Sequence, residues 1–145
     1  MRPQPYTYRA RPVRVIDGDT LVADLDLGFD TTLRTTLRLA GCNARELSEP
    51  GGREARAHLE ELLLSPWLGP RDWPLVASTI KPDKFGGRYD AHLHWPDTPR
   101  SMQDEREDEY IDSLVDLLIR NHWAAPWDGR GPRPLPPWPR PEDLP

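Results

Sequence analysis

The stretch Val15-Ile16-Asp17-Gly18-Asp19-Thr20 joins two apolar runs and decides the fold of this 145-residue chain. Apolar and polar residues alternate over residues 8–16 before it and over residues 20–27 after it. A period of two is typical of β-strands with one buried face. The Asp-Gly-Asp sequence between them predicts a tight turn, in which Gly18 is free to adopt a positive φ angle.

Alternation returns over residues 33–39, which predicts a three-stranded antiparallel meander. The period then changes, because the apolar residues between 55 and 63 recur at helical spacing until Ser65-Pro66 ends the pattern. Strand character resumes over residues 73–80 and 89–95. The middle of the chain therefore predicts one helix followed by two further strands.

The C-terminal third is polar and rich in proline. Residues 96–109 predict a loop, and apolar residues at helical spacing then predict a second helix over about 111–121. The last twenty residues contain eight prolines, which lack a backbone donor and cannot continue a helix or a central strand. We expect residues 126–145 to form a polyproline-like tail, either extended against the barrel or without fixed structure.

Five strands with a helix inserted after the third match the OB-type barrel, whose strand faces and loops commonly bind oligonucleotides. The predicted fold is therefore α+β, a five-stranded OB-type β-barrel with two packed helices over residues 1–125 and a proline-rich C-terminal tail over residues 126–145. A chain of 145 residues is long enough for one hydrophobic core and too short for two ordinary ones.

The net charge of −5 resides in the C-terminal third. Residues 1–95 contain 13 basic and 13 acidic side chains, so their charges cancel, whereas residues 96–145 contain 6 and 11. Proteins that bind nucleic acid are usually basic. The first two-thirds of the chain can still present a locally positive site, because the acidity is confined to the rest.

The cellular context follows from what the sequence lacks. Cys42 is the single cysteine, which excludes an internal disulfide and a zinc site with several thiolates. No stretch approaches the roughly 18 apolar residues of a membrane helix, and residues 1–6 lack the apolar region of a secretory signal. We expect a cytoplasmic monomer that does not contact a membrane.

Four charged residues carry candidate chemistry. Asp19 is a hard oxygen donor at a strand start, suited to Ca²⁺ or Mg²⁺. Arg38 lies in a strand between apolar neighbours, Glu46 lies on the loop after that strand, and Arg88 follows two glycines. Each residue alone is better explained as a turn cap or a solvated charge. It is the occurrence of all four residues together, in this order along the chain, that indicates a site.

Three motifs resemble the staphylococcal (micrococcal) nuclease family. Residues 15–20 resemble its IDGDT turn, residues 37–46 (LRLAGCNARE) resemble RLxGxDxPE, and residues 83–88 (DKFGGR) are similar to DKYGR. Residues 118–124 are a weaker match to the helix end LVRxGLA. The motifs span about residues 8 to 125 in the family's order and spacing, and the first two are the specific ones.

The resemblance implies hydrolysis of DNA or RNA phosphodiester bonds with one divalent ion, Ca²⁺, with Mg²⁺ or another divalent ion as the alternative. It implies that Asp19 and Asn43 hold the ion, which polarises the phosphate and fixes the attacking water. It also implies that Glu46 is the general base that accepts a proton from this water.

The remaining roles concern the nucleic acid itself. By the same resemblance, Arg38 and Arg88 stabilise the charge that builds on the phosphate oxygens, for which a fork-shaped guanidinium is suited. Lys84 and Phe85 are predicted to contact the nucleic acid. Cleavage at the 5′ P–O bond, leaving 3′-phosphate ends, is the expected outcome.

The sequence departs from the family motif at three positions. Asn43 replaces an aspartate, so the site has one negative charge fewer and is predicted to bind Ca²⁺ more weakly. Arg45 replaces a proline, which adds a cation to the loop before Glu46 and makes this loop less rigid. Gly87 is an additional residue before Arg88, so the alignment of this arginine with the motif is ambiguous by one residue.

Two other classes of function stay open. The first is a non-catalytic nucleic-acid-binding or scaffolding barrel whose metal site is degenerate. The second is a protein-interaction module that binds a protein partner through the acidic helix and the proline-rich tail, which contains Trp127 and Trp138. His92 and His94 point to one face of a strand, but such a pair more often packs than binds a metal.

Overall fold

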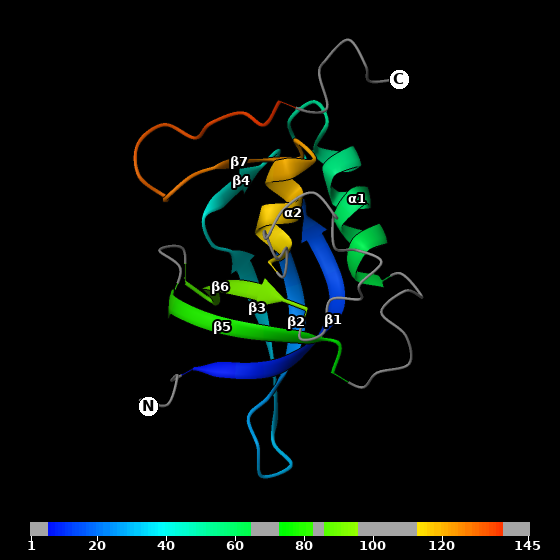
Figure 1. Ribbon diagram of the computed structural model, residues 1–145, viewed down its shortest axis with the longest axis vertical. Coiled ribbons are helices and arrows are strands. Elements are labelled where there is room, and N and C mark those ends of the chain that lie inside the picture. Colours follow the sequence, from blue (N-terminus) through cyan, green and yellow to red (C-terminus); the bar gives the residue numbers. More distant parts are fainter. Residues whose placement is uncertain (1–5, 65–72, 83–85, 96–112, 138–145) are drawn as a thin grey trace, which may run out of the picture.

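The strands on either side of the Asp-Gly-Asp turn form part of a closed barrel in the computed structural model, which describes residues 6–64, 73–82, 86–95 and 113–137 (Figure 1). The elements run in the order β1 (Thr7–Asp17), β2 (Thr20–Asp26), β3 (Thr32–Leu39), β4 (Cys42–Ala44), α1 (Gly52–Leu64), β5 (Leu75–Pro82), β6 (Arg88–His94), α2 (Leu114–Arg120) and β7 (Ala124–Pro126). β1 pairs antiparallel with β2, and β2 pairs antiparallel with β3. The predicted meander is therefore confirmed.

The two strands that follow α1 close the barrel. β6 pairs antiparallel with β5 and parallel with β3, and β5 pairs antiparallel with β1. The strand order is β1-β2-β3-β6-β5, with β5 returning to β1. The sheet is thus mixed, and the predicted combination of a five-stranded barrel with two helices is present.

A two-stranded sheet, in which β4 pairs antiparallel with β7, has no counterpart in the prediction. Each strand has only three residues, which is too short for a period of two to be recognised. In this sheet Asn43 lies opposite Ala125. The pairing therefore holds the chain that follows α2 against the segment that follows β3.

The second helix is shorter than predicted at its N-terminal end. Ser113 has extended backbone angles and forms a β-bridge with His94, so α2 begins at Leu114. Pairing with the end of β6 is the physical reason, because a residue that pairs with a strand cannot also be helical. Ile111 and the predicted loop 96–109 lie outside the described residues.

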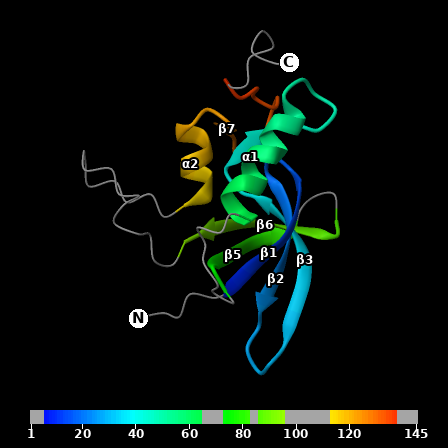
Figure 2. The same ribbon diagram turned by 90° about the vertical axis from the view of Figure 1, so that its right-hand side faces the viewer.

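Both helices lie over the same half of the barrel (Figures 1 and 2). Each helix buries one apolar face. The buried leucines of the helices are Leu59 and Leu63 in α1 and Leu114 and Leu118 in α2, each at most 1% exposed. They form one cluster with Leu21, Leu37, Leu39, Leu75 and Leu93 of the barrel strands. Burial of each such side chain stabilises the fold by about 2 kcal/mol. None of the helices in the described ranges is long and apolar enough to cross a membrane.

β2 is buried on both faces, and its outward side contains a charged residue. Asp24 is directly opposite Arg11 on β1 and Arg34 on β3. Its carboxylate accepts hydrogen bonds from Nε of Arg34 at 2.8 Å and Nε of Arg11 at 3.2 Å. These contacts, above all the bond from Arg34, lower the pKa of Asp24. Two guanidinium groups thus compensate the burial of this carboxylate.

Gly18 is required in the turn for a reason other than the predicted one. Its φ angle does not lie in the positive range adopted by other glycines of the chain, so the expectation of a positive φ is wrong. A Cβ atom at this position would lie 2.8 Å from the Cβ of Ala44 and 2.9 Å from the Cβ of Ala55. The turn therefore needs glycine because β4 and α1 pack directly against its backbone.

We expect Gly18→Ala to lower the free energy of unfolding by about 3 kcal/mol, because neither alanine methyl can rotate away from the added methyl group. Gly28→Ala is the comparison, since Gly28 has a φ of +80° and no atom within 4 Å of an added Cβ. It should cost about 1 kcal/mol through backbone strain alone. Urea unfolding of both variants measures the difference, and equal costs would contradict the packing explanation.

Candidate functional site

Asp19 connects the β1–β2 turn to β4. Its side chain is buried, with a residue exposure of 6%. Oδ2 accepts a hydrogen bond from the backbone N–H of Ala44 at 2.9 Å, and Oδ1 accepts one from the hydroxyl of Thr20 at 2.9 Å. The backbone carbonyl of Asp19 accepts a further bond from the N–H of Leu39 at 2.8 Å. The carboxylate is therefore held at the junction of three strands.

Arg38 extends from β3 to the same junction. Its Nη2 lies 3.5 Å from Oδ2 of Asp19, and the arginine side chain is only 15% exposed. The guanidinium also donates to the carbonyl of Leu39 and to the carbonyl of Cys42, both at 3.3 Å. The indole of Trp127, from the segment after β7, lies with its ring centre 5.6 Å from the guanidinium carbon. Arg38 is thus fixed in place and partly covered.

Asp17 adds a second carboxylate beside Asp19. Its Oδ1 accepts a hydrogen bond from the backbone N–H of Asp19 at 3.1 Å. Burial, together with the negative charge of Asp19, raises the pKa of Asp17 from 3.8 to about 7. No guanidinium is among the causes of this shift, in contrast to Asp24. Arg38 pairs with Asp19 and not with Asp17, so a further cation beside the two carboxylates would stabilise the charged form of Asp17.

Asn43 and Glu46 lie on either side of Ala44 and share one partner, Arg133. Nε of Arg133 donates to Oδ1 of Asn43 at 3.0 Å, and Nη1 lies 3.1 Å from Oε1 of Glu46. The amide nitrogen of Asn43 donates to the carbonyl of Pro134 at 2.8 Å. Asn43 is 1% exposed, whereas the Glu46 side chain is 55% exposed. Both the oxygen and the nitrogen of the Asn43 amide therefore form hydrogen bonds within the protein.

Arg88 lies on the strand next to Arg38. In the parallel register Thr36 is opposite Arg88 and Arg38 is opposite Asp90, so the two arginines are one strand and two residues apart. Residues separated by two positions point to the same side of a sheet. Arg88 therefore belongs to the same face of the barrel as Arg38. Lys84 and Phe85 lie outside the described residues.

Two neighbouring residues of the motif have structural roles. The buried Arg45 donates from Nη1 to the carbonyl of Pro50 at 3.2 Å and from Nη2 to the carbonyl of Pro136 at 3.0 Å. The Cys42 thiol is buried, and burial raises its pKa to about 12. A thiol with this pKa is not a nucleophile at neutral pH.

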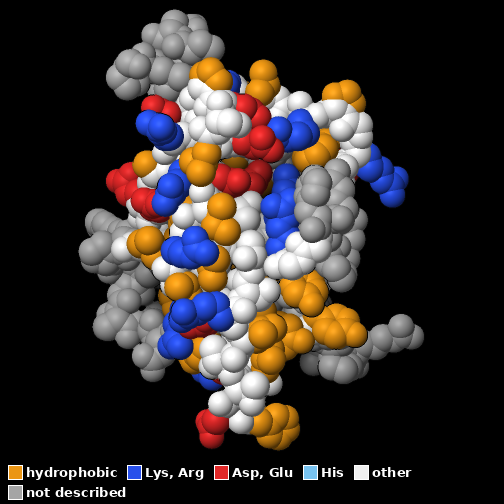
Figure 3. All heavy atoms as spheres, turned by 180° about the vertical axis from the view of Figure 1, so that it is seen from behind, with side chains coloured by type: hydrophobic (Ala, Val, Ile, Leu, Met, Phe, Trp, Pro, Cys, Tyr) orange, Lys and Arg blue, Asp and Glu red, His pale blue; other side chains and the backbone are white. Residues whose placement is uncertain are grey.

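The structure thus brings Asp19, Arg38, Asn43 and Glu46 together around Ala44 and puts Arg88 on the adjoining strand. Acidic side chains lie directly beside a stripe of basic ones in the upper half of the face in Figure 3. Three contributors were not predicted: Asp17, Trp127 and Arg133. Asp17 could have been found, since it belongs to the Asp-Gly-Asp motif. Nothing in the sequence pattern of the tail marks Arg133.

Some of the residues around Asp19 are suitable ligands for a divalent ion. Asp17 and Asp19 provide two adjacent carboxylates of the kind that hard cations prefer. The Asn43 amide oxygen faces Arg133, so it reaches a cation only after that contact opens. Among the described residues, no three His, Cys, Asp or Glu side chains form a metal-binding group. His92 and His94, with ring centres 6.2 Å apart, accordingly remain a pair without a third protein ligand of these types in the described ranges.

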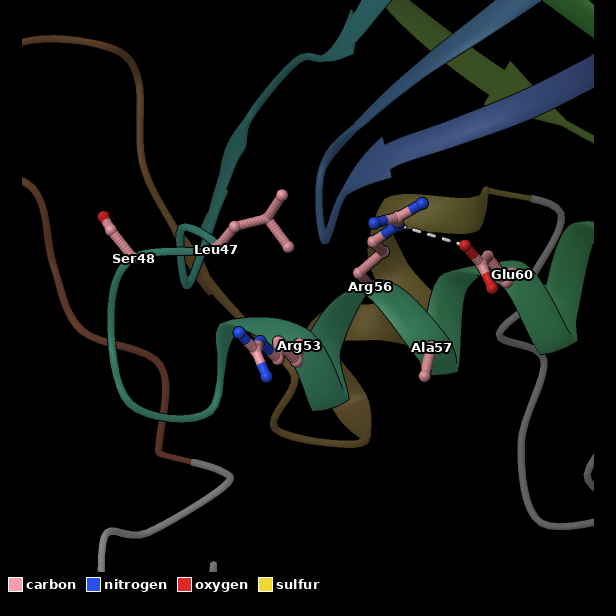
Figure 4. Close-up of a pocket in the computed structure, with 6 residues that line it drawn as sticks. All are labelled: Leu47, Ser48, Arg53, Arg56, Ala57 and Glu60. Carbon is pink, nitrogen blue, oxygen red and sulfur yellow. Dashed lines mark hydrogen bonds and ion pairs between the residues drawn. The ribbon is translucent and has the colours of Figure 1, made fainter.

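A surface hollow of about 640 Å³ lies between α1 and the loop before it (Figure 4). Its lining residues are Leu47, Ser48, Arg53, Arg56, Ala57 and Glu60. Nε of Arg56 donates to Oε1 of Glu60 at 3.1 Å, so one basic charge of the hollow is already paired. Asp19, Arg38 and Asn43 are not part of this lining, so the hollow adjoins the site without containing it.

Comparison with protein-family models finds no matching family, and comparison with curated proteins finds no matching relative. The functional hypothesis therefore rests on the motifs and on the geometry around Asp19.

The raised pKa of Asp17 predicts a pH-dependent stability. The folded protein holds the proton of Asp17 more tightly than the unfolded chain does. The stabilisation from this proton is therefore fully present below about pH 4 and is lost as the pH rises to about 7. Asp17→Asn keeps the acceptor for the Asp19 N–H and removes the charge. We expect it to be more stable than the wild type by on the order of 2 kcal/mol at pH 8, and nearly equal at pH 4. Thermal unfolding at both pH values tests this, and a gain independent of pH would refute the titration of Asp17 as its cause.

Proposed function

We propose that the chain is an OB-type barrel of the nuclease kind, which binds a DNA or RNA phosphodiester at the face around Asp19 and hydrolyses it with a divalent ion. The observation that carries the proposal is the junction of Asp19, Arg38 and Ala44. Here a carboxylate and a guanidinium lie 3.5 Å apart, and the hydrogen bond from Ala44 holds the loop that leads to Glu46 beside them.

The carboxylates Asp17 and Asp19 would hold the ion, and the amide oxygen of Asn43 would join them once its contact with Arg133 opens. When bound, a divalent ion polarises the phosphate and lowers the pKa of the attacking water. Arg38 is already oriented by two backbone carbonyls, so little reorganisation is needed before its guanidinium stabilises the phosphate charge. Arg88, on the neighbouring strand, would add a second positive charge on the same face.

Glu46 would accept the proton of the attacking water. Its side chain is 55% exposed, against 15% for Arg38 and 8% for Asp19, so it is accessible to water. It stands two residues after Ala44, the residue bound to Asp19. In the described arrangement Oε1 of Glu46 forms an ion pair with Arg133, so this oxygen can accept a proton from water only after the contact opens.

The second candidate is a non-catalytic barrel that binds nucleic acid. The specific observation in its favour is the engagement of Asn43 and Glu46 by Arg133, because the guanidinium occupies oxygens assigned to metal binding and proton transfer. Binding of a protein partner through the proline-rich tail, residues 126–145, stays a prediction, and residues 138–145 of this tail lie outside the described ranges.

Glu46→Gln tests the catalytic proposal with a matched control in the same loop. Glu46 and Glu49 both pair with Nη1 of Arg133 at 3.1 Å, so each Glu→Gln change removes one charge and weakens the same contact. We expect Glu46→Gln to lower the cleavage rate by about 10² to 10³, the usual cost of losing a catalytic group, while Glu49→Gln changes it by less than about threefold. Equal losses in the two variants would assign the effect to Arg133 and not to proton transfer.

Digestion of plasmid DNA and RNA with Ca²⁺, Mg²⁺ or a chelator separates the two candidates. Cleavage that requires a divalent ion supports the enzyme. A wild-type protein that retards an oligonucleotide in a gel shift yet leaves it intact with every ion would establish the binding module instead.

A further inference from the structure

The C-terminal segment 127–137, here called the strap, returns over the end of the molecule that contains β4 and the start of α1 (Figures 1 and 2). The N–H of Trp127 donates to the carbonyl of Gly41 at 3.0 Å, and its indole N–H donates to the carbonyl of Arg130 at 2.8 Å. The strap thus begins with a hydrogen-bonded turn at the edge of the candidate site.

Two side chains of the site loop anchor the strap. Asn43 donates to the carbonyl of Pro134 at 2.8 Å, and Arg45 donates to the carbonyl of Pro136 at 3.0 Å. The two donor residues are separated by two positions in the sequence, and so are the two acceptor residues. The strap is therefore held in register by side-chain donors to its proline carbonyls, and these contacts need no backbone N–H from the prolines.

The two anchors are also two of the positions where the sequence departs from the nuclease motif. An aspartate at position 43 would place an acceptor against the Pro134 carbonyl, and a proline at position 45 would offer no side-chain donor. Asparagine and arginine each supply the side-chain donor that the strap uses. The substitution of Asn43 therefore has a positive explanation in the structure.

Arg133 is the cation of the strap, and all three of its guanidinium nitrogens are engaged. Nε donates to Asn43 at 3.0 Å, Nη1 lies 3.1 Å from both Glu46 and Glu49, and Nη2 donates to the carbonyl of Ala44 at 3.4 Å. Together with the indole of Trp127 beside Arg38, the strap contacts three residues to which the proposed function assigns roles.

From these contacts we infer that the strap is a built-in competitor of the divalent ion. Anchored by Asn43 and Arg45, it presents the Arg133 guanidinium to the Asn43 and Glu46 oxygens, so that a complete metal site forms only when the strap is released. That the competing ligand is a divalent ion rests on the proposed function. That the strap covers Asn43 and Glu46 rests on the strap contacts alone. Coupling between two ligands of one site is reciprocal, so the ion must loosen the strap as much as the strap weakens the ion.

The first test is calorimetric titration of the full chain with Ca²⁺ alone. Arg133→Gln removes the ion pairs of the strap, and Arg130→Gln removes the same charge from an exposed residue of the same segment whose described hydrogen bonds are made by its backbone. We expect Arg133→Gln to lower the half-saturating Ca²⁺ concentration by about fivefold or more relative to Arg130→Gln. Equal values for the two variants would overturn the competition and leave the metal site standing.

The second test uses hydrogen exchange of the strap amides, which is independent of activity and of the folding yield of any variant. Saturating Ca²⁺ should accelerate exchange at residues 127–135 of the wild type by about fivefold, because the strap opens as the ion binds. Arg133→Gln should reach this rate without Ca²⁺. Binding of Ca²⁺ with unchanged strap exchange would overturn the inference. If the wild type and both variants fail to bind Ca²⁺, the metal-dependent function fails as well, so the two failures are distinguishable.

Discussion

The close approach of the Gly18 backbone to β4 and α1 is the constraint on which the rest of the structure depends. Because Gly18 has no Cβ, the methyl groups of Ala44 and Ala55 can lie against the turn. The Asp19 carboxylate then reaches the N–H of Ala44 at 2.9 Å. Close backbone packing at Gly18 thus allows the hydrogen bond that positions the first site residue.

The same constraint recurs at the start of α1. A Cβ atom on Gly52 would lie 1.8 Å from the backbone carbonyl of Glu46, so the loop that bears Glu46 rests directly on the first turn of the helix. The turn, the loop and the helix are therefore packed as one unit. Residues of this unit could contribute to a site with little loss of entropy on binding, because their backbones are already ordered.

Asp24 and Asp17 lie on one hairpin, and their surroundings give the two carboxylates different roles. Asp24 receives hydrogen bonds from two arginines, and its pKa falls. Asp17 is also shielded from water but lies beside another carboxylate, and its pKa rises to about 7. The first arrangement is compensated and supports the barrel wall. In the second, no guanidinium is among the causes of the Asp17 shift, and Arg38 pairs with the neighbouring Asp19 instead.

The strands around the Asp-Gly-Asp turn and the presence of two helices could be predicted from the sequence, because alternation and helical spacing are local properties. Motif order likewise singled out Asp19, Arg38 and Glu46 as one group. Long-range packing sets the parallel pairing of β6 with β3, the β4–β7 sheet, the steric need for Gly18 and the contacts of the strap. Arg133 is 90 residues from Asn43 in sequence, and no local pattern records a contact over that distance. The partners of Asn43, and with them the meaning of an asparagine where the motif has an aspartate, depend on how the chain returns after α2. That return is set by three-residue strands and by side-chain donors to proline carbonyls, which leave no periodic signal in the sequence.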